Sequence, residues 1–401
     1  MKNILFATLV DINSLDESGI YQDLLREITL LGHRVYVVSP YERRQNKQTV
    51  FLPSRTGGIL KVRVGNIQKT GKLEKGISTV RLERQYLKAV KKYFADIKFD
   101  TVMYSTPPIT LGKLISYIRH RDGAESYLLL KDIFPQNAVD LGMLAKKTYL
   151  YRYFRKKETR LYEMSDFIGC MSKANVDYLV KHNRQLDPSK VHICPNSISI
   201  RPQENAAKCD EIRDQYGIPR EKKVFVYGGN LGKPQSVAFI TQCLKLNQNK
   251  DDRYFLICGE GTDAELITEY IEEEAPTNVM FIQALPKKEY DELLCACDVG
   301  LIFLDHRFTI PNFPSRLLSY MQQGLPVLAC TDAHSDVGFT VISGEFGYWC
   351  MSGNAKYFSQ AVDEILSMDD AAFEEMGRRS RAYLEQNYSA SYWAAKIAEK
   401  L

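Results

Sequence analysis

The chain has 401 residues, which is more than one ordinary hydrophobic core supports and fits two α/β domains of comparable size. Hydrophobic residues make up 45% of it and charged residues 25%, which is the composition of an ordinary globular protein. The formal net charge of +4 excludes a strongly basic nucleic-acid binder.

The nine cysteines are odd in number and contain no CxxC pair, so we interpret them as reduced core residues of a cytosolic protein rather than disulfides or zinc ligands. Cys295 and Cys297 fall on a helical pattern, which also argues against a zinc site. We expect no secretory leader, because Met1 is followed at once by a charged residue and a strand pattern. No apolar run is long enough to cross a bilayer.

The first half opens with a β–loop–α–β pattern. Residues Asn3–Val10 predict a buried strand, Asp11–Gly19 a polar loop, Tyr21–Leu31 a helix and Val35–Ser39 a second strand. The loop has one glycine and lacks GxGxxG, so no nicotinamide cofactor is predicted. Residues Tyr41–Lys75 are polar with little periodicity, and either short strands or a mobile loop fit them.

Residues 146–160, KKTYLYRYFRKKETR, alternate basic and aromatic side chains. One interpretation is a helix with a solvated basic face. The other is contact with an anionic membrane surface or a lipid-linked pyrophosphate, because aromatic residues suit the interface and bases meet phosphates. Nucleic acid is the weakest of the three interpretations, and no nucleic-acid partner is predicted.

The second half repeats the β/α rhythm after a polar stretch near Ser197–Asp210. The strand Lys223–Tyr227 leads into GGNLGKPQ, where glycines permit close backbone approach and Lys233 can meet an anion, although a plain tight turn also fits. A later strand ends in Gly259-Glu260-Gly261. Glu260 can accept two ribose hydroxyls there, or it can cap a helix.

The segment Asp298–Cys330 combines a buried strand, Val299–Leu304, with a helix that begins at Ser315 and ends at Gly324. Ser315 is expected to cap this helix, whose unpaired first amides would bind a phosphate-bearing ligand. Arg316, in its first turn, would add a charged fork for a diphosphate. The alternative is that this is one of several equivalent units that any α/β protein contains.

Several motifs in order resemble one enzyme family. YGGNLGK, CGEG, ALPKKEYDELLCACDVGLIFL and PSRLLSYMQQGLPVLA follow one another as in the family 4 glycosyltransferases, which are retaining enzymes with the GT-B fold. KNILFAT and LREITLLGHRVYVVSP resemble the opening of the same enzymes. LKDIFPQNAVDLGML is similar to a motif of their bacterial surface-polysaccharide branch, which makes O-antigen, capsule or exopolysaccharide.

The resemblance implies an α/β fold of the GT-B type, with two Rossmann-like domains facing a central cleft. Residues 1–197 would form the acceptor-side domain, joined by a C-terminal crossing helix at about 385–401. Residues 198–384 would form the nucleotide-sugar domain. The reaction implied is transfer of a hexosyl or N-acetylhexosaminyl group from a nucleotide sugar, expected to be UDP-linked although GDP is not excluded, with no metal or other cofactor.

The resemblance also assigns residues to the donor site. The diphosphate would lie over the helix N-terminus formed by Phe313, Pro314, Ser315 and Leu317. Two glutamates of the family motif are replaced here by Pro311 and Ser319, and the family arginine by Asn230, so Glu260 would carry more of the ribose recognition. The predicted substrate-binding set is Gly19, Gly229, Asn230, Gly259, Glu260, Gly261, Phe313, Pro314, Ser315, Leu317 and Ser319.

Asp132, Lys233 and Arg316 are the predicted catalytic residues. Lys233 and Arg316 would stabilise the leaving diphosphate, whose own oxygen would take the acceptor's proton. Asp132 would orient the sugar or the acceptor, or it is only a cap at the end of a strand. Gly19 would let the backbone approach a substrate closely.

The expected acceptor is a glycan or a polyprenyl-pyrophosphate-linked glycan, and the expected location is the cytoplasm, with peripheral association at the inner face of the membrane. Two alternatives remain open at this point. The first is a non-catalytic GT-B partner subunit, which the lost glutamates and Asn230 favour. The second is a non-hydrolysing sugar-nucleotide epimerase.

Overall fold

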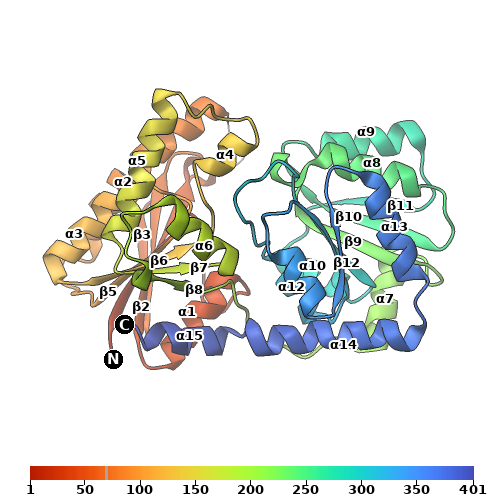
Figure 1. Cartoon of the computed structure of the whole chain (residues 1–401). Coiled ribbons are helices and arrows are strands. Elements are labelled where there is room, and N and C mark those ends of the chain that lie inside the picture. Colours follow the sequence, from red (N-terminus) through yellow and green to blue (C-terminus); the bar gives the residue numbers. More distant parts are fainter. Residues whose placement is uncertain (68–70) are drawn as a thin grey trace. The chain divides into compact units, whose positions relative to one another are not determined.

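A computed structural model of the chain describes residues 1–67 and 71–401 and divides them into two compact units. Unit 1 consists of Met1–Ser199 and Ala390–Leu401, and unit 2 is Ile200–Ser389 (Figure 1). The junctions thus fall at 199/200 and 389/390, where the sequence predicted 197/198 and about 385.

The described part of unit 1 forms one eight-stranded sheet in the order β3-β4-β2-β1-β5-β6-β7-β8. All neighbouring pairs are parallel except β3 and β4. The strands are β1 Asn3–Ala7, β2 Arg34–Glu42, β3 Val50–Ser54, β4 Gly57–Val64, β5 Thr101–Ser105, β6 Glu125–Leu130, β7 Phe167–Cys170 and β8 Val191–Ile193. Most are apolar runs buried on both faces, as parallel strands between two helix layers must be.

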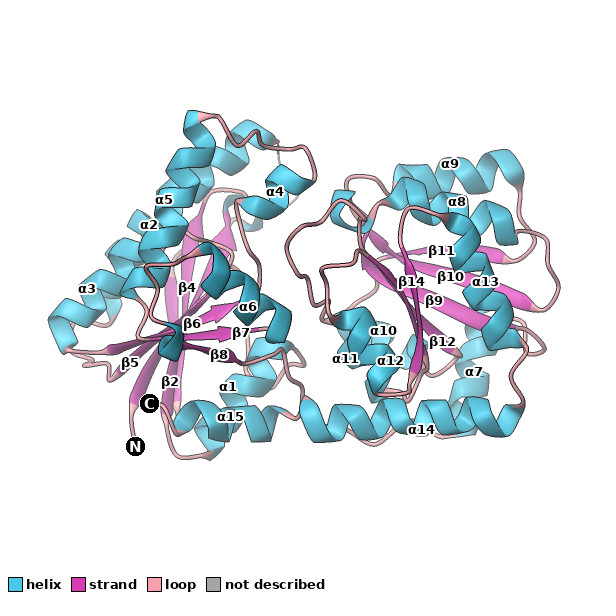
Figure 2. Cartoon of the chain, in the orientation of Figure 1, coloured by secondary structure: helices cyan, strands magenta, loops and turns pink. Residues whose placement is uncertain are grey.

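Helices cover both faces of this sheet (Figure 2). They are α1 Ile20–Leu30, α2 Lys72–Tyr93, α3 Gly112–Asp122, α4 Gln136–Asp140, α5 Tyr149–Met164, α6 Lys173–His182 and α15 Ala390–Ala398. The last of these packs against α1, and its Ala394 and Ile397 share one hydrophobic core with Phe6 and Leu25. The C-terminal segment is therefore an integral part of the core of unit 1.

Unit 2 contains a fully parallel six-stranded sheet in the order β11-β10-β9-β12-β13-β14. Its strands are β9 Lys223–Asn230, β10 Arg253–Glu260, β11 Val279–Gln283, β12 Val299–Phe303, β13 Val327–Thr331 and β14 Gly347–Met351. Its helices are α7 Ala206–Tyr216, α8 Val237–Asn247, α9 Glu265–Glu274, α10 Lys287–Leu294, α11 Arg316–Gln322, α12 Val337–Ser343, α13 Ala355–Leu366 and α14 Asp370–Asn387.

Two sequence-based expectations differ from the structure, and one that left strands and a loop open as alternatives is decided in favour of strands. The first strand ends at Ala7 rather than Val10, whose side chain is exposed. The stretch Tyr41–Lys75 holds the end of β2, strands β3 and β4 and the start of α2, except for residues 68–70, which lie outside the described part. Helix α10 ends at Leu294, so Cys297 lies beyond the helix on which its pattern placed it.

A partly buried histidine couples the stability of unit 1 to pH. His192 on β8 lies with Nε2 2.6 Å from the Tyr127 hydroxyl. Burial, followed by the nearby Lys400 charge, lowers the pKa of His192 from its ordinary value to about 4. Between pH 6.5 and 4 the unfolded chain binds a proton that the folded chain does not, so this contribution to stability is present above pH 6.5 and is lost as pH falls toward 4.

We expect His192→Gln to remove this dependence, because glutamine does not titrate. When the pH is lowered from 7 to 5, the free energy of unfolding should decrease by about 1 kcal/mol less in the variant than in the wild type. The measurement is urea unfolding followed by the fluorescence of Trp393, in a Trp349→Phe background that leaves no other tryptophan. Asp132 and Glu158, whose pKa values burial raises, are present in both proteins and cancel. Equal losses in both proteins would contradict the assignment.

Candidate functional site

The strand order of unit 2 reverses between β9 and β12, because β10 and β11 extend the sheet on one side and β13 and β14 on the other. Ligands of open α/β sheets bind outside the carboxyl ends of the strands at such a switch point. The predicted binding residues of the second half lie at the carboxyl ends of β9 and β10 or in the segment that follows β12. The structure therefore brings these residues to one place within unit 2.

The carboxyl ends of β9 and β10 lie closer than side chains would allow. Gly229 has φ +127°, a conformation that favours glycine. A Cβ on Gly259 would lie 2.0 Å from the Gly229 carbonyl oxygen, and one on Gly261 would lie 2.1 Å from the Leu231 carbonyl oxygen. The Leu231 N–H donates to the Glu260 carbonyl at 2.8 Å. Gly259 and Gly261 thus share one physical reason, which is contact of backbone with backbone, whereas Gly229 is favoured by its positive φ.

The turn after β9 is held from both sides. Asn230 Nδ2 donates to Gln235 Oε1 at 2.7 Å across the short 3₁₀ helix Lys233–Gln235. The Pro234 carbonyl accepts from the Asp305 N–H at 2.9 Å, which ties the turn to the end of β12. Lys233 itself is exposed at the first position of the turn, so its ammonium is free to reach an anion at this edge.

Helix α11 begins differently from the prediction. Ser315 precedes the helix, but its side chain makes no capping hydrogen bond. The amides of Leu317 and Leu318 already donate to the carbonyls of Pro314 and Ser315, at 3.3 and 3.1 Å. This tight first turn uses two donors that were expected to face a phosphate. The Leu317 side chain is fully buried, and the Phe313 ring lies 6.0 Å from the ring of Tyr388.

Arg316 does not present the open fork expected of it. Its guanidinium lies over the ring of Tyr227, 4.3 Å from the centroid, and Nη1 is buried without a hydrogen-bond partner among the described residues. Nη2 lies 3.3 Å from where a Cβ of Gly229 would stand. The charge therefore sits behind the Gly229 backbone, because the tyrosine ring draws the side chain inward.

Tyrosines missed by sequence reasoning build this arrangement. The Tyr320 hydroxyl donates to the Leu301 carbonyl at 3.0 Å and accepts from the Gly228 N–H at 3.2 Å, so it links α11 to β12 and β9. Its ring fills the space where Gly300 lacks a Cβ. No sequence pattern signals this, because Tyr320 looks like any apolar position of a helix.

The positions where the resemblance led us to expect glutamates have different surroundings. Ser319 Oγ lies 3.4 Å from Nζ of Lys287, which also pairs with Asp291 on α10. At the position where the resemblance predicts a glutamate carboxylate, the chain thus has the Ser319 hydroxyl beside the Lys287 ammonium. Glu260 lies exposed at the end of β10, next to the turn that carries Lys233.

Two predicted residues lie in unit 1. Gly19 precedes α1 in extended backbone, after the loop that leaves β1. Asp132 follows β6, and both of its carboxylate oxygens accept from Asn137 Nδ2, at 2.9 and 2.8 Å. Burial raises the pKa of Asp132 to about 6. Both residues are at the carboxyl edge of the unit 1 sheet. The Asp132 carboxylate is oriented there by its hydrogen bonds from Asn137.

Sequence reasoning also missed buried charges near Asp132. Lys131 donates to the Cys194 carbonyl at 3.3 Å, and burial lowers the pKa of its ammonium to about 8. Glu158 on α5 accepts from Tyr162 at 2.7 Å and from Arg155 at 2.8 Å, and burial raises its pKa to about 7. Arg155 thus serves the interior of unit 1 and belongs to neither the solvated basic face nor a membrane-binding face.

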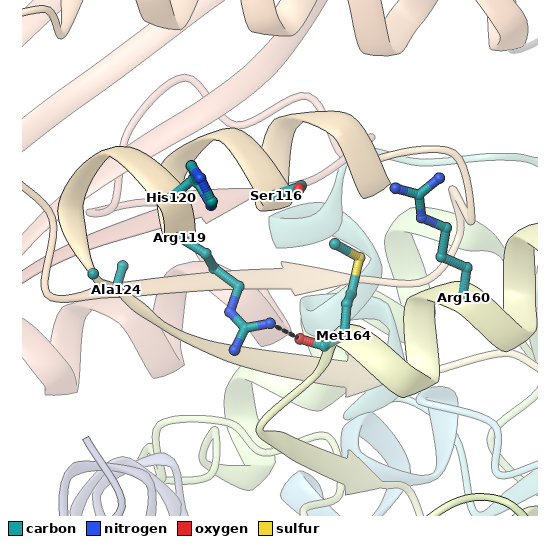
Figure 3. Close-up of a pocket in the computed structure, with 7 residues that line it drawn as sticks. Ser116, Arg119, His120, Ala124, Arg160 and Met164 are labelled. Carbon is teal, nitrogen blue, oxygen red and sulfur yellow. Dashed lines mark hydrogen bonds between the residues drawn. The ribbon is translucent and has the colours of Figure 1, made fainter.

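A pocket of about 490 Å³ lies between α3 and α5, away from this edge. Ser116, Arg119 and His120 line it from α3, with Arg160 and Met164 from α5 (Figure 3). Arg119 donates to the Met164 carbonyl at 2.6 Å and pairs with Asp166 at 2.8 Å. Because α3 ends here and β6 then begins, the pocket lies at the amino edge of the sheet, where this fold does not place its ligands.

Two features are absent from the part of the chain that the structure describes. No group of three or more His, Cys, Asp or Glu side chains in residues 1–67 and 71–401 is arranged to hold a metal ion. None of the helices in that part of the chain has the length and apolar character needed to cross a membrane.

Known proteins share this sequence pattern and fold. Residues 208–383 match the family model described as Glycosyl transferases group 1. The chain is 25% identical over 332 residues to "Probable glycosyltransferase WbjE" of Pseudomonas aeruginosa, which covers 81% of this chain and 80% of that protein. The chain is a glycosyltransferase.

Solved structures match this glycosyltransferase over nearly its full length. HepE from Anabaena, in complex with UDP, has a TM-score of 0.71 at 13% identity and covers 100% of this chain and 99% of its own. WaaG, a glycosyltransferase involved in lipopolysaccharide biosynthesis, has a TM-score of 0.66 at 14% identity and covers 98% and 99%. At such identities the likeness concerns the fold, and it confirms the predicted two-domain α/β fold of the GT-B type.

We expect Gly259→Ala to open the site of this glycosyltransferase. The new methyl group meets the Gly229 carbonyl at 2.0 Å, so the ends of β9 and β10 must separate, at about 1–3 kcal/mol of unfolding free energy. Urea unfolding followed by Trp349, in a Trp393→Phe background, measures this for unit 2. The control is Gly112→Ala at the start of α3 in unit 1, followed by Trp393 in the Trp349→Phe background; the nearest atom there is 3.7 Å away and the change should be under about 0.5 kcal/mol. Similar values for the two variants would refute the close-approach argument.

Proposed function

We propose that this glycosyltransferase moves a sugar from a nucleotide-sugar donor, UDP-linked, to a glycan or polyprenyl-diphosphate-linked acceptor with retention of anomeric configuration. The observation that carries the proposal is the convergence of Lys233, the close-packed glycines and the start of α11 at one switch point. HepE, of the same fold, has structures in complex with UDP and with UDP-glucose, which supports a UDP-linked donor. WaaG and its part in lipopolysaccharide biosynthesis support a role in bacterial surface polysaccharide synthesis.

In this proposal the diphosphate lies over the turn after β9. As the bond between the sugar C1 and the diphosphate oxygen breaks, its electron pair stays on the diphosphate. Lys233 meets that charge from the solvent side, and Arg316 acts on it through the glycine backbone, where low dielectric strengthens the field. The amides of Ser315 and Arg316, which form no hydrogen bond within the described chain, supply further donors.

The acceptor hydroxyl attacks C1 and passes its proton to the leaving diphosphate oxygen, so no residue of the chain forms a covalent intermediate. Asp132, with a pKa of about 6, is ionised at neutral pH and accepts a hydrogen bond from the acceptor or the sugar. The scheme requires only the donor and the acceptor, and charge on the diphosphate is balanced by Lys233 and Arg316 rather than by a metal ion.

A nucleotide panel tests the donor site. UDP, GDP and their common sugar conjugates are titrated by calorimetry into the wild type and Lys233→Ala. We expect one diphosphate nucleotide to bind and its affinity to fall roughly 10- to 100-fold in the variant, because a charge-assisted hydrogen bond to phosphate is lost. The matched control is Lys245→Ala, an exposed lysine on α8 that pairs with Glu274. Undiminished affinity in Lys233→Ala, or binding of no nucleotide, would overturn the proposed site.

We also propose that the exposed side chains of residues 146–160, which do not include Arg155, rest on an anionic membrane surface at the cytoplasmic face of the cell membrane. At the start of α5, Tyr149 is 87% exposed, Leu150 54% and Tyr153 42%, beside exposed Lys146 and Lys147. Apolar side chains held in water next to bases suit a lipid headgroup layer. The Thr148 side chain caps the helix, which fixes these residues on one segment.

Vesicle sedimentation at low salt tests this surface. The wild type should bind vesicles of phosphatidylglycerol and phosphatidylcholine more tightly than pure phosphatidylcholine. The double variant Lys146→Gln/Lys147→Gln should lose about 2 kcal/mol, or roughly 30-fold, since each base contributes about 1 kcal/mol near an anionic surface. Lys88→Gln/Lys92→Gln on α2, also two exposed bases of unit 1, is the control. Equal binding to both vesicle types counts against the proposal.

A further inference from the structure

A second pocket of unit 1, of about 600 Å³, lies at the end of β4 against α2. It is lined by Arg43, Arg63, Val64, Gly65, Glu74, Ser78, Arg81 and Gln85, and we refer to it as the arginine pocket. It opens at the carboxyl edge of the sheet, where this fold places its ligands, and its volume is that of a small-molecule site. None of its residues belongs to the donor site in unit 2.

The arginine pocket carries excess positive charge. Its lining contains three arginines and one glutamate, which leaves an excess of two positive charges. Glu74 pairs with Arg43 at 2.6 Å and also accepts from Asn66 Nδ2 at 2.9 Å. The side chains of Arg63 and Arg81 form no hydrogen bond or ion pair within the part of the chain that the structure describes. Two guanidinium groups on facing elements, β4 and α2, are therefore free to bind an anion.

Gln85 adds a second, independent observation. Its Nε2 donates to the Arg63 carbonyl at 3.2 Å, which fixes the amide between β4 and α2. Its Oε1 is buried and has no hydrogen-bond partner among the described residues. A buried acceptor without a donor is costly, and a ligand hydroxyl would satisfy it. The pocket is thus complementary to a ligand that has both an anionic group and a hydroxyl.

Guanidinium groups bind phosphate oxygens in a fork, and two of them side by side match a diphosphate. The nucleotide donor is assigned to unit 2, so a diphosphate bound here belongs to the other substrate. A glycan linked through a diphosphate has both of these groups, because it carries anionic oxygens and sugar hydroxyls. A neutral glycan would leave Arg63 and Arg81 unpaired.

We propose that the arginine pocket binds the diphosphate of the acceptor, with Arg63 and Arg81 on its oxygens and Gln85 on a hydroxyl of the attached sugar. This inference rests on the proposed function, because it names the substrate group that the proposed transfer requires. Arg63 and Arg81 are acceptor-specificity residues in this assignment, and they leave the chemistry at the donor unchanged.

The first test is binding without turnover. Inorganic pyrophosphate and farnesyl diphosphate are titrated by calorimetry into the full chain saturated with UDP, so that the donor site is filled. The double variant Arg63→Gln/Arg81→Gln should bind both at least 10-fold more weakly, whereas Arg84→Gln, an exposed arginine on α2 outside the pocket, should match the wild type. Retention of affinity in the double variant, or the same loss in Arg84→Gln, would overturn the proposal. Arg63→Lys/Arg81→Lys, which keeps both charges, should recover part of the affinity and excludes misfolding as the cause.

The second test separates a lipid-linked diphosphate from other phosphate sources. Transfer is compared for a sugar on a polyprenyl diphosphate and the same sugar on an alkyl chain without phosphate. The double variant should raise KM for the diphosphate acceptor at least 10-fold and leave KM for the donor and for the alkyl acceptor unchanged. An equal rise for both acceptors would overturn the assignment. Absence of transfer by the wild type would refute the proposed function instead, and the calorimetric result would still decide whether the pocket binds diphosphate.

Discussion

The site in unit 2 depends on one constraint, the contact of backbone with backbone at the carboxyl ends of β9 and β10. Gly259 and Gly261 lie where a Cβ would overlap the carbonyls of Gly229 and Leu231. Because the strands close here, the chain must leave β9 in the tight turn that exposes Lys233. The hydrogen bond from Asp305 to Pro234 then ties that turn to β12, after which the chain leads on to α11. Residues from three segments are thus ordered by a contact that involves no charge.

Arg316 shows how the same packing sets an electrostatic property. A solvated arginine near a diphosphate is screened and pays for ordering a long side chain. Here the guanidinium is ordered beforehand over Tyr227 and lies against Gly229, where the lack of a Cβ lets it approach the backbone. Its field at the turn is stronger for being partly buried, at the cost of one Nη1 that has no partner among the described residues. This is the arrangement of a preorganised site.

The sequence predicted most of the fold and less of the site, for physical reasons. Apolar runs such as Val299–Leu304 locate strands because both faces are buried, and Gly324 marks the end of α11 because it adopts φ +69°. The stretch Tyr41–Lys75 left strands and a loop open as alternatives because the apolar run of the edge strand β3 is only three residues long and ends at Pro53, and because Lys61 and Arg63 interrupt the apolar pattern of β4. The direction of Arg316 depends on Tyr227, 89 positions away, and the pairing of Arg155 with Asn183 depends on contact with the end of α6. Neither contact can be predicted from the local periodicity of the sequence, because each joins residues that lie far apart in it.

The replaced glutamates change the charge of the site and so the kind of recognition it can perform. A carboxylate at position 319 would repel a nearby phosphate and hold ribose hydroxyls as a double acceptor. Ser319 accepts and donates only weakly, and Lys287 beside it adds positive charge to the same face of α11. Under the proposed function, recognition of the ribose shifts to Glu260, the carboxylate that remains at the end of β10. A site with fewer acidic groups near the diphosphate binds the intact donor more tightly. Such tighter binding speeds the reaction only if Lys233 and Arg316 stabilise the charge that develops on the leaving diphosphate in the transition state more than they stabilise the intact donor.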